Sequence, residues 1–98
     1  MDQFEVFSEI LRSHRQELED VYGVKQLAIF GSTVRQEQTP TSDIDIVIDF
    51  DPSKGLFVFL DLKKHLEELL EHPVDLVTYR ALHPALRDHI LNEARDAF

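Results

Sequence analysis

The chain has 98 residues, of which 43% are hydrophobic, and it contains no cysteine. A chain of this length builds one hydrophobic core and has no room for a second, substrate-binding domain, so we expect a single domain over residues 1–98. The lack of cysteine excludes disulfides, thiol catalysis and zinc sites built from cysteine.

The charge is strongly acidic, with 19 acidic and 10 basic side chains and a net charge of −9. Because proteins bind the phosphate backbone through lysine and arginine, this balance argues against direct binding of nucleic acid. It fits a basic protein partner, or simply keeps a small domain soluble. The first residues, MDQFEVFSEI, are acidic and amphipathic, and no apolar run has the length of a membrane span, so we expect a cytoplasmic protein.

The first predicted elements are a helix over residues 4–21 and a strand over residues 25–30. Apolar side chains recur at helical spacing in the first segment, which should end near Gly23. The second segment ends in a continuous apolar run suited to an interior strand. The predicted apolar stripe of the helix comprises Phe4, Phe7, Ile10, Leu11, His14, Leu18 and Val21.

The stretch GSTVRQEQTPTSDIDIV, residues 31–47, follows that strand directly. Glycine lets the backbone approach a ligand closely, and Ser32 is predicted to cap a short helix whose first amides favour a phosphate. Arg35, one turn further on, could reach a phosphate or an acidic neighbour. The polar loop 36–42 ends at Ser42, where a second strand is expected over residues 43–50.

Asp43 and Asp45 stand one residue apart at the start of this second strand. Side chains of a strand alternate between its two faces, so both carboxylates point the same way while Ile44 and Ile46 enter the core. Their repulsion is about 2–3 kcal/mol at an effective dielectric of about 20. A magnesium ion, which prefers carboxylate, water and phosphate oxygens, would remove this cost. Asp49 and Asp51 continue the alternation and could extend the acidic face, but the simpler interpretation is that they cap the solvent-exposed end of the strand.

A helix over residues 56–71 and a strand over residues 73–79 are expected next. The strand–helix–strand order predicts a right-handed parallel crossover, which places Asp75 level with Asp43 and Asp45. Three carboxylates from two neighbouring strands could then meet at one metal site. A simpler alternative is that Asp75 lies on an edge strand and pairs with a cation such as Arg80.

A last helix is predicted over residues 84–98, opening with Pro84 in its first turn. Its expected buried face consists of Leu86, Ile90, Leu91, Ala94 and Phe98. Together these elements predict an α/β domain of the α+β type, in which a small mixed sheet of three to four strands is flanked by about four helices.

The order Gly-Ser, about ten residues, then Asp-x-Asp resembles the signature of the DNA polymerase beta-like nucleotidyltransferase superfamily. Within it the chain is most similar to the minimal nucleotidyltransferase branch and to the antitoxins of HEPN/MNT toxin–antitoxin pairs. The resemblance extends from the first strand to the last helix. One departure is Gln36, which stands where the family usually has glycine; we therefore expect that the loop does not use a left-handed conformation there.

This resemblance implies a nucleotidyl transfer reaction with ATP as substrate. Asp43, Asp45 and Asp75 would be the catalytic residues and would hold two Mg²⁺ ions. Gly31, Ser32, Arg35 and Ser42 would bind the nucleotide. The acceptor would be a tyrosine hydroxyl on a HEPN ribonuclease toxin, which adenylylation would silence.

Three other functions remain open at this point. The chain could be a binding antitoxin that neutralises its partner by occlusion with an inactive nucleotide site. It could modify a small molecule such as an aminoglycoside, although such enzymes need a further domain for the acceptor. A metal-dependent nuclease is disfavoured by the Gly-Ser turn and the acidic surface.

Overall fold

The fold is built on one mixed, four-stranded sheet, as seen in a computed structural model that describes residues 2–37, 39 and 42–98. The strands are β1 (Val24–Phe30), β2 (Ile44–Phe50), β3 (Val74–Thr78) and β4 (Arg95–Asp96), and they lie in the order β3-β2-β1-β4. β1 is antiparallel to β2 and to β4, whereas β2 and β3 are parallel. The predicted mixed sheet and parallel crossover are therefore confirmed.

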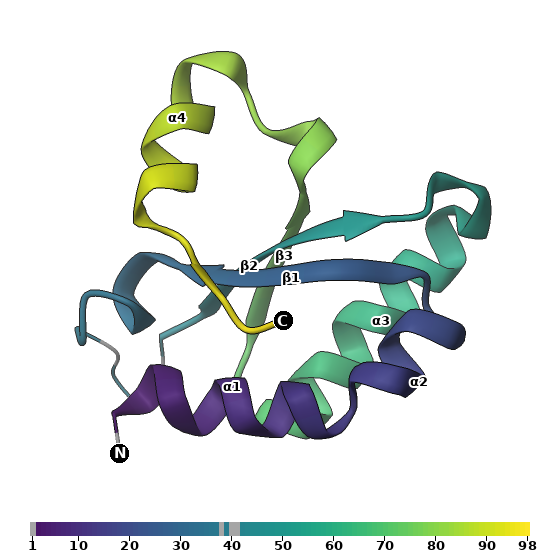
Figure 1. Ribbon diagram of the computed structural model, residues 1–98, viewed down its shortest axis with the longest axis horizontal. Coiled ribbons are helices and arrows are strands. Elements are labelled where there is room, and N and C mark those ends of the chain that lie inside the picture. The colour runs from purple at the N-terminus through teal and green to yellow at the C-terminus, as the bar shows by residue number, and fades with distance from the viewer. Residues whose placement is uncertain (1, 38, 40–41) are drawn as a thin grey trace.

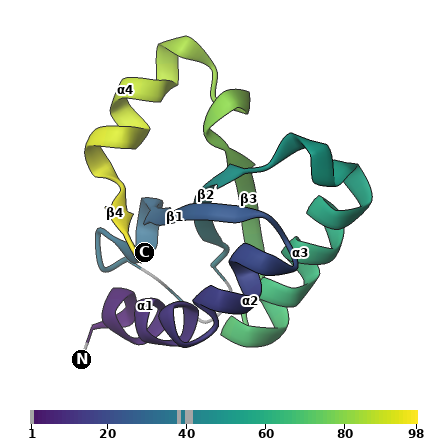
Figure 2. The same ribbon diagram turned by 45° about the vertical axis from the view of Figure 1, so that its right-hand side comes forward.

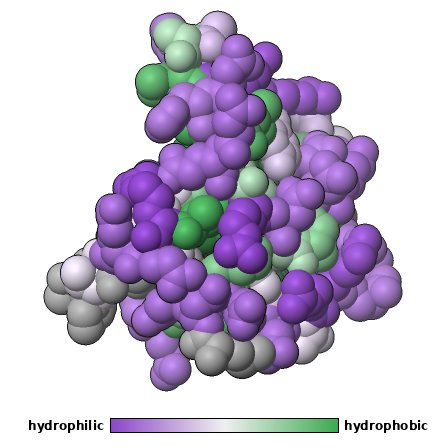
Figure 3. All heavy atoms as spheres, turned by 60° about the vertical axis from the view of Figure 1, so that its left-hand side comes forward, coloured by the Kyte–Doolittle hydropathy of each residue, from purple (hydrophilic) through white to green (hydrophobic). Residues whose placement is uncertain are grey.

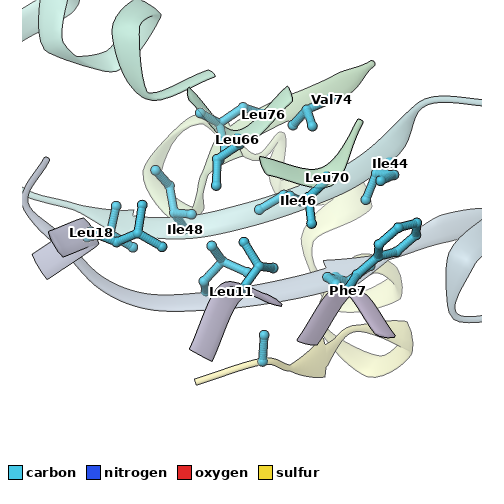
Figure 4. Close-up of a cluster of buried hydrophobic side chains, with 14 of the residues drawn as sticks. Phe7, Leu11, Leu18, Ile44, Ile46, Ile48, Leu66, Leu70, Val74 and Leu76 are labelled. Atoms are coloured by element: carbon cyan, nitrogen blue, oxygen red, sulfur yellow. The ribbon is translucent and has the colours of Figure 1, made fainter. Parts of the chain in front are cut away.

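Three helices cover one face of this sheet (Figure 1). They are α1 (Gln3–Ser13), α2 (Arg15–Asp20) and α3 (Gly55–Leu70), which is the crossover between β2 and β3. No helix of the described residues is long and apolar enough to cross a membrane. The core between helices and sheet is shown in Figure 4, and its fully buried side chains include Leu11, Leu18, Leu27, Ile29, Ile44, Ile46, Ile48, Leu62 and Leu66.

The predicted helix over residues 4–21 is two helices, and the break at His14 has a local cause. The Ser13 hydroxyl donates to the Ile10 carbonyl over 2.7 Å, and Nδ1 of His14 lies 2.9 Å from the same oxygen. Side chains that bond a helix carbonyl compete with the backbone ladder and bend the helix. Val21, predicted to be buried, is 57% exposed beyond the end of α2.

The fourth helix, α4 (Pro84–Glu93), lies over the other face of the sheet and stands away from the main body (Figure 2). Its predicted extension to residue 98 is wrong, because the chain turns extended at Ala94 and forms β4. The amide of Ala97 donates to the Leu27 carbonyl over 2.9 Å, so the final residues pair with β1, which would otherwise be an open edge.

The expected buried face of α4 is also wrong in part. Leu86 and Leu91 are 55% and 41% exposed, and no residue of the helix is fully buried. Ile90 and Ala94 do pack, against a small second cluster of Ala28, Val47 and Leu82 on this face of the sheet. The open face therefore has only a small apolar contact with α4, and polar side chains of the strands remain accessible beside it.

Two leucines of α3 provide a test of this packing. Leu66 is completely buried, whereas Leu60 is 50% exposed on the same helix. We expect Leu66→Ala to lower the free energy of unfolding by about 2–5 kcal/mol because it leaves a cavity in the core. Leu60→Ala should cost less than about 1 kcal/mol. Urea denaturation of both variants measures the difference, and equal losses would contradict the described orientation of α3.

Candidate active site

A row of three paired residues crosses the sheet and positions the predicted carboxylates. Asp45 on β2 pairs with Phe30 on β1 and with Asp75 on β3. Directly paired residues of neighbouring strands point to the same face. Asp45 and Asp75 therefore lie side by side on the open face, while Ile44 and Ile46 are completely buried on the other. The predicted level placement of Asp75 with Asp45 is confirmed.

Gly31 follows Phe30 in the chain and contacts the Asp45 carboxylate directly. A Cβ atom at this position would collide with Oδ2 of Asp45 and would lie 3.1 Å from its Cγ. Gly31 also has φ of +74°, a conformation that side chains rarely adopt. Only glycine meets both conditions, so the turn η1 (Gly31–Thr33) and the carboxylate fit together because a side chain is missing.

The pKa of Asp45 is raised from 3.8 to about 6. The largest cause is burial, and the next are the charges of Asp75 and Asp43; Arg35 acts in the opposite direction. The carboxyls of Asp45 and Asp75 also lie within hydrogen-bonding reach of each other, which favours the protonated form of Asp45. The structure thus holds carboxyl groups close together at a site that favours a proton or a cation.

The donor set fits a magnesium ion by its chemistry, since it consists of carboxylates beside a glycine turn. Asp43 precedes β2 and is exposed, whereas Asp45 is half-buried and Asp75 is exposed. Among the described residues, no three Asp, Glu, His or Cys side chains are arranged so that they could hold one metal ion. The three-carboxylate metal site therefore stays a prediction, with Asp45 and Asp75 as its observed pair.

The two serines of the predicted nucleotide site occupy different surroundings. Ser32 is the second residue of η1 and not the N-cap, which is Phe30, so its predicted capping role is wrong. Its carbonyl accepts from the Glu37 amide over 2.8 Å and closes the turn. The Ser42 hydroxyl accepts from the Thr39 amide over 3.1 Å. Contact of either serine with a nucleotide stays a prediction, and Gln38, Pro40 and Thr41 of the same loop lie outside the described residues.

Gln36 adopts the left-handed conformation that we did not expect of it. Its φ is +63°, and its Nε2 donates to Oδ2 of Asp2 over 2.9 Å. The other oxygen of Asp2 accepts from the Glu5 amide at the start of α1 over 2.8 Å. The loop therefore takes the path that glycine would permit. The strained Gln36 is held by the hydrogen bond of its own side chain to Asp2, the N-cap of α1.

Arg35 lies one turn beyond Gly31, to whose carbonyl its amide donates over 3.2 Å, and its side chain is bound by two carboxylates. Its Nε donates to Oε2 of Glu37 over 3.2 Å, and its Nη1 forms an ion pair with Glu93 at the end of α4. Glu93 is 58 positions away in the chain, so no local pattern could have found it. Figure 3, in which the left-hand side of Figure 1 comes forward, shows mostly hydrophilic side chains, with hydrophobic side chains at the centre and near the top of the view.

The chain also matches a known family. The model of the nucleotidyltransferase domain matches residues 11–97, which include both strands that carry the carboxylates and the whole Gly-Ser turn. A mixed sheet with paired carboxylates beside that turn is the arrangement expected of an enzyme that transfers nucleotides. The chain belongs to this nucleotidyltransferase family.

Its relatives include archaeal proteins of similar size. A protein of Methanocaldococcus jannaschii named "Putative protein adenylyltransferase" is 52% identical over 75 residues, which are 76% of this chain and 81% of the relative. The protein adenylyltransferase MntA of Thermococcus cleftensis is 38% identical over 89 residues, which are 91% of this chain and 90% of that protein.

Solved structures agree with the fold. One described as "Structure of putative minimal nucleotidyltransferase" has a TM-score of 0.74 and 36% identity, and covers 97% of this chain and 95% of its own. A complex of a tri-AMPylated HEPN toxin of Shewanella oneidensis with an MNT antitoxin has a TM-score of 0.69. At 17% identity, with 96% of this chain and 71% of that chain covered, this second likeness concerns the fold alone.

The contact between Gly31 and Asp45 can be tested by a double-mutant cycle. Gly31→Ala should lower the free energy of unfolding by about 2–4 kcal/mol, because the methyl group collides with the carboxylate and the residue has positive φ. In an Asp45→Ala background only the backbone strain remains, and the loss should fall to about 1–2 kcal/mol. Chemical denaturation of the four proteins gives the coupling, and identical losses in both backgrounds would refute the contact.

The raised pKa of Asp45 predicts how stability depends on pH. Its value of about 6 in the folded state exceeds the ordinary 3.8, so the folded protein binds more protons between about pH 4 and 6. The free energy of unfolding should therefore fall as pH rises through this window. Asp45→Asn removes this effect, and we expect it to be more stable than the native chain by about 1–2 kcal/mol at pH 8 in EDTA, after allowing for partial solvent screening.

Thermal unfolding at pH 4 and pH 8 measures this difference. Near pH 4 the advantage of Asp45→Asn should largely disappear, since the native carboxyl is then protonated in the folded state. Asp49→Asn is the matched control, because Asp49 lies on the same strand and its cross-strand partner is Gln26, which carries no charge. If the native chain is at least as stable as Asp45→Asn at pH 8, the ionised Asp45 is not destabilised by its burial and by the neighbouring carboxylates, and the prediction is wrong.

Proposed function

We propose that this chain is a magnesium-dependent protein adenylyltransferase that acts as an antitoxin. It would move AMP from ATP to a hydroxyl group of a HEPN-type toxin protein. The observation that carries the proposal is the pair Asp45–Asp75 held against the Gly31 turn. One relative above 35% identity is named "Protein adenylyltransferase MntA" and another "Putative protein adenylyltransferase", which supports a protein as the acceptor.

The chain's own residues would divide into two groups around the substrate. Gly31 and Ser32 would place the phosphates, because the glycine leaves the backbone open to close approach. Arg35 would bind a phosphate oxygen, and Ser42 lies where the loop returns to the carboxylates. Asp43, Asp45 and Asp75 would hold Mg²⁺, which neutralises charge on the triphosphate and on the leaving pyrophosphate.

The reaction would be an in-line displacement at the α-phosphorus of ATP. The acceptor oxygen forms a bond to this phosphorus as the bond to the bridging oxygen of the β-phosphate breaks. Pyrophosphate leaves with the electron pair of that bond. Asp75, which is exposed beside Asp45, would accept the proton of the attacking hydroxyl. Because the face above Asp75 is open, a folded protein could bring its hydroxyl to this position.

Intact-mass spectrometry tests the proposal directly. The purified chain is incubated with Mg·ATP and the protein that co-purifies with it from its native cells. We expect the partner to gain one or more adenylyl units, with release of an equal number of pyrophosphate molecules. Asp45→Asn should lower the rate by at least about 100-fold, because the carboxylate that neutralises and positions the reacting groups is lost. Asp49→Asn should retain the activity.

A non-catalytic antitoxin gives a different result in the same experiment. If a tight complex forms without added mass for any nucleoside triphosphate, the chain neutralises its partner by occlusion. The partner's inhibition would then be unchanged by Asp45→Asn. Loss of inhibition in Asp45→Asn, together with loss of the added mass, would instead establish that transfer is the means of inhibition.

A further inference from the structure

Arg35 is fixed by carboxylates from two separate parts of the chain. Glu37 follows it in the same loop and accepts from Nε, whereas Glu93 closes α4 and pairs with Nη1. These two contacts engage two of the three nitrogens of the guanidinium group. Within the described part of the chain, no hydrogen bond engages the third nitrogen, Nη2. As far as the described residues are concerned, its two N–H groups could therefore bind a ligand.

Glu93 is the firmer of the two carboxylates. Its side chain is 17% exposed, compared with 63% for Glu37. It is the last residue of α4, and the chain beyond it is bonded to β1 through Ala97. The second oxygen of Glu93 lies 3.7 Å from Nε2 of His89, one turn earlier on the same helix. The carboxylate is thus supported by a helix and a strand and not by the loop alone.

Arg35 also lies one turn beyond the glycine that contacts Asp45, since its amide donates to the Gly31 carbonyl over 3.2 Å. The charge of its guanidinium group lowers the pKa of Asp45, opposing the burial that raises it. On the side of α4, an open groove of about 350 Å³ is lined by Arg35, His89, Asn92 and Glu93. A triphosphate at the Gly31 turn could therefore reach Arg35 from the side of Asp45. Glu93 contacts the same arginine from the side of the groove.

We infer that Glu93 is a positioning residue for the nucleotide site, which it serves by holding Arg35 in the orientation that binds a phosphate of ATP. This inference rests on the proposed role of Arg35. A free arginine side chain samples many rotamers, and these must be given up when a phosphate binds. Glu93 restricts them beforehand, so α4 contributes to nucleotide affinity without touching the nucleotide.

Glu93 could also compete with the phosphate for Arg35, and this alternative predicts the opposite change in nucleotide affinity. A carboxylate that competes with phosphate for Arg35 weakens nucleotide binding, so its removal would tighten binding. A carboxylate that positions Arg35 strengthens binding, so its removal would weaken it. The two carboxylates contact Nε and Nη1 and not Nη2, which favours positioning because a phosphate bound at Nη2 need not displace Glu93.

Isothermal titration calorimetry with Mg·ATP tests the inference on the full chain. We expect Glu93→Ala to weaken binding by about five- to tenfold, the size expected when a long side chain must be ordered on binding. Glu93→Gln keeps a hydrogen-bond acceptor for Nη1 and should stay within about twofold of the native affinity. Asp88→Ala is the matched control, because it removes an equal charge from the same helix outside the groove.

A double-mutant cycle shows whether Glu93 acts through Arg35. In an Arg35→Ala background, Glu93→Ala should have no further effect on affinity. The inference would be overturned if Glu93→Ala lowered the affinity by the same five- to tenfold in the Arg35→Ala background. It would also be overturned if Glu93→Ala alone left binding unchanged or made it tighter. If Glu93→Ala does not fold, Glu37→Ala removes the other contact and should weaken binding to a smaller degree; unchanged affinity would then count against the inference.

The outcome is separable from that of the proposed function. In transfer assays Glu93→Ala should raise KM for ATP with little change in kcat, which a general loss of structure would not produce. A native chain that binds Mg·ATP but transfers nothing would refute the proposed function while the binding cycle still decides the role of Glu93. A native chain that transfers AMP but is insensitive to Glu93→Ala would refute the inference alone.

Discussion

Two like charges held side by side in a sheet are the constraint on which the site depends. Asp45 and Asp75 face each other across β2 and β3, and burial raises the pKa of Asp45 to about 6. When both carboxylates are ionised, they repel each other in this arrangement. The neighbouring Ile44 and Ile46, completely buried on the other face, fix the strand and so hold Asp45 where it is. The core therefore stabilises a local arrangement that is unfavourable without a proton or a cation.

The site is completed by groups that leave space or add charge around this pair. Gly31 leaves out the atom that would collide with Asp45, and its positive φ sets the path of the following turn. Arg35 partly offsets the carboxylates, and its own charge is balanced by Glu37 and Glu93. Charged groups thus extend from Asp75 on β3 and Asp45 on β2 through Arg35 to Glu93 on α4. Removing any one of these charges should change the electrostatic environment of its neighbours.

Much of the fold could be predicted because it follows from local pattern and chain topology. Alternation placed Asp45 on the open face, and the right-handed crossover placed Asp75 beside it. The end of the chain could not be predicted in this way. Residues 90–98 carry apolar side chains at helical spacing, yet the backbone partner offered by β1 makes the last of them a strand. The break at His14 depends similarly on side chains that compete for one carbonyl.

The site was predictable to the extent that its residues are close in sequence or are related by the sheet. The Gly-Ser turn and the carboxylates of β2 lie within one short stretch, and their contact follows from the hairpin of β1 and β2. Glu93 has neither relation to Arg35. Gln36 illustrates a different limit, since residue preferences favour glycine at positive φ but do not exclude a glutamine whose side chain is bonded to Asp2.

The pairing of Asp45 with Asp75 also restricts how the length of this chain can change during evolution. The Pro73 carbonyl accepts from the Ile44 amide and sets the register one residue before β3 begins. An extra residue in the turn at Glu71 and His72 would be absorbed before that point. An extra residue between Pro73 and Asp75 would turn the carboxylate toward the core, and an insertion before Val74 would also move Val74 to the open face. Homologues should therefore vary in length at the turn and keep the number of residues from Pro73 to Asp75 constant.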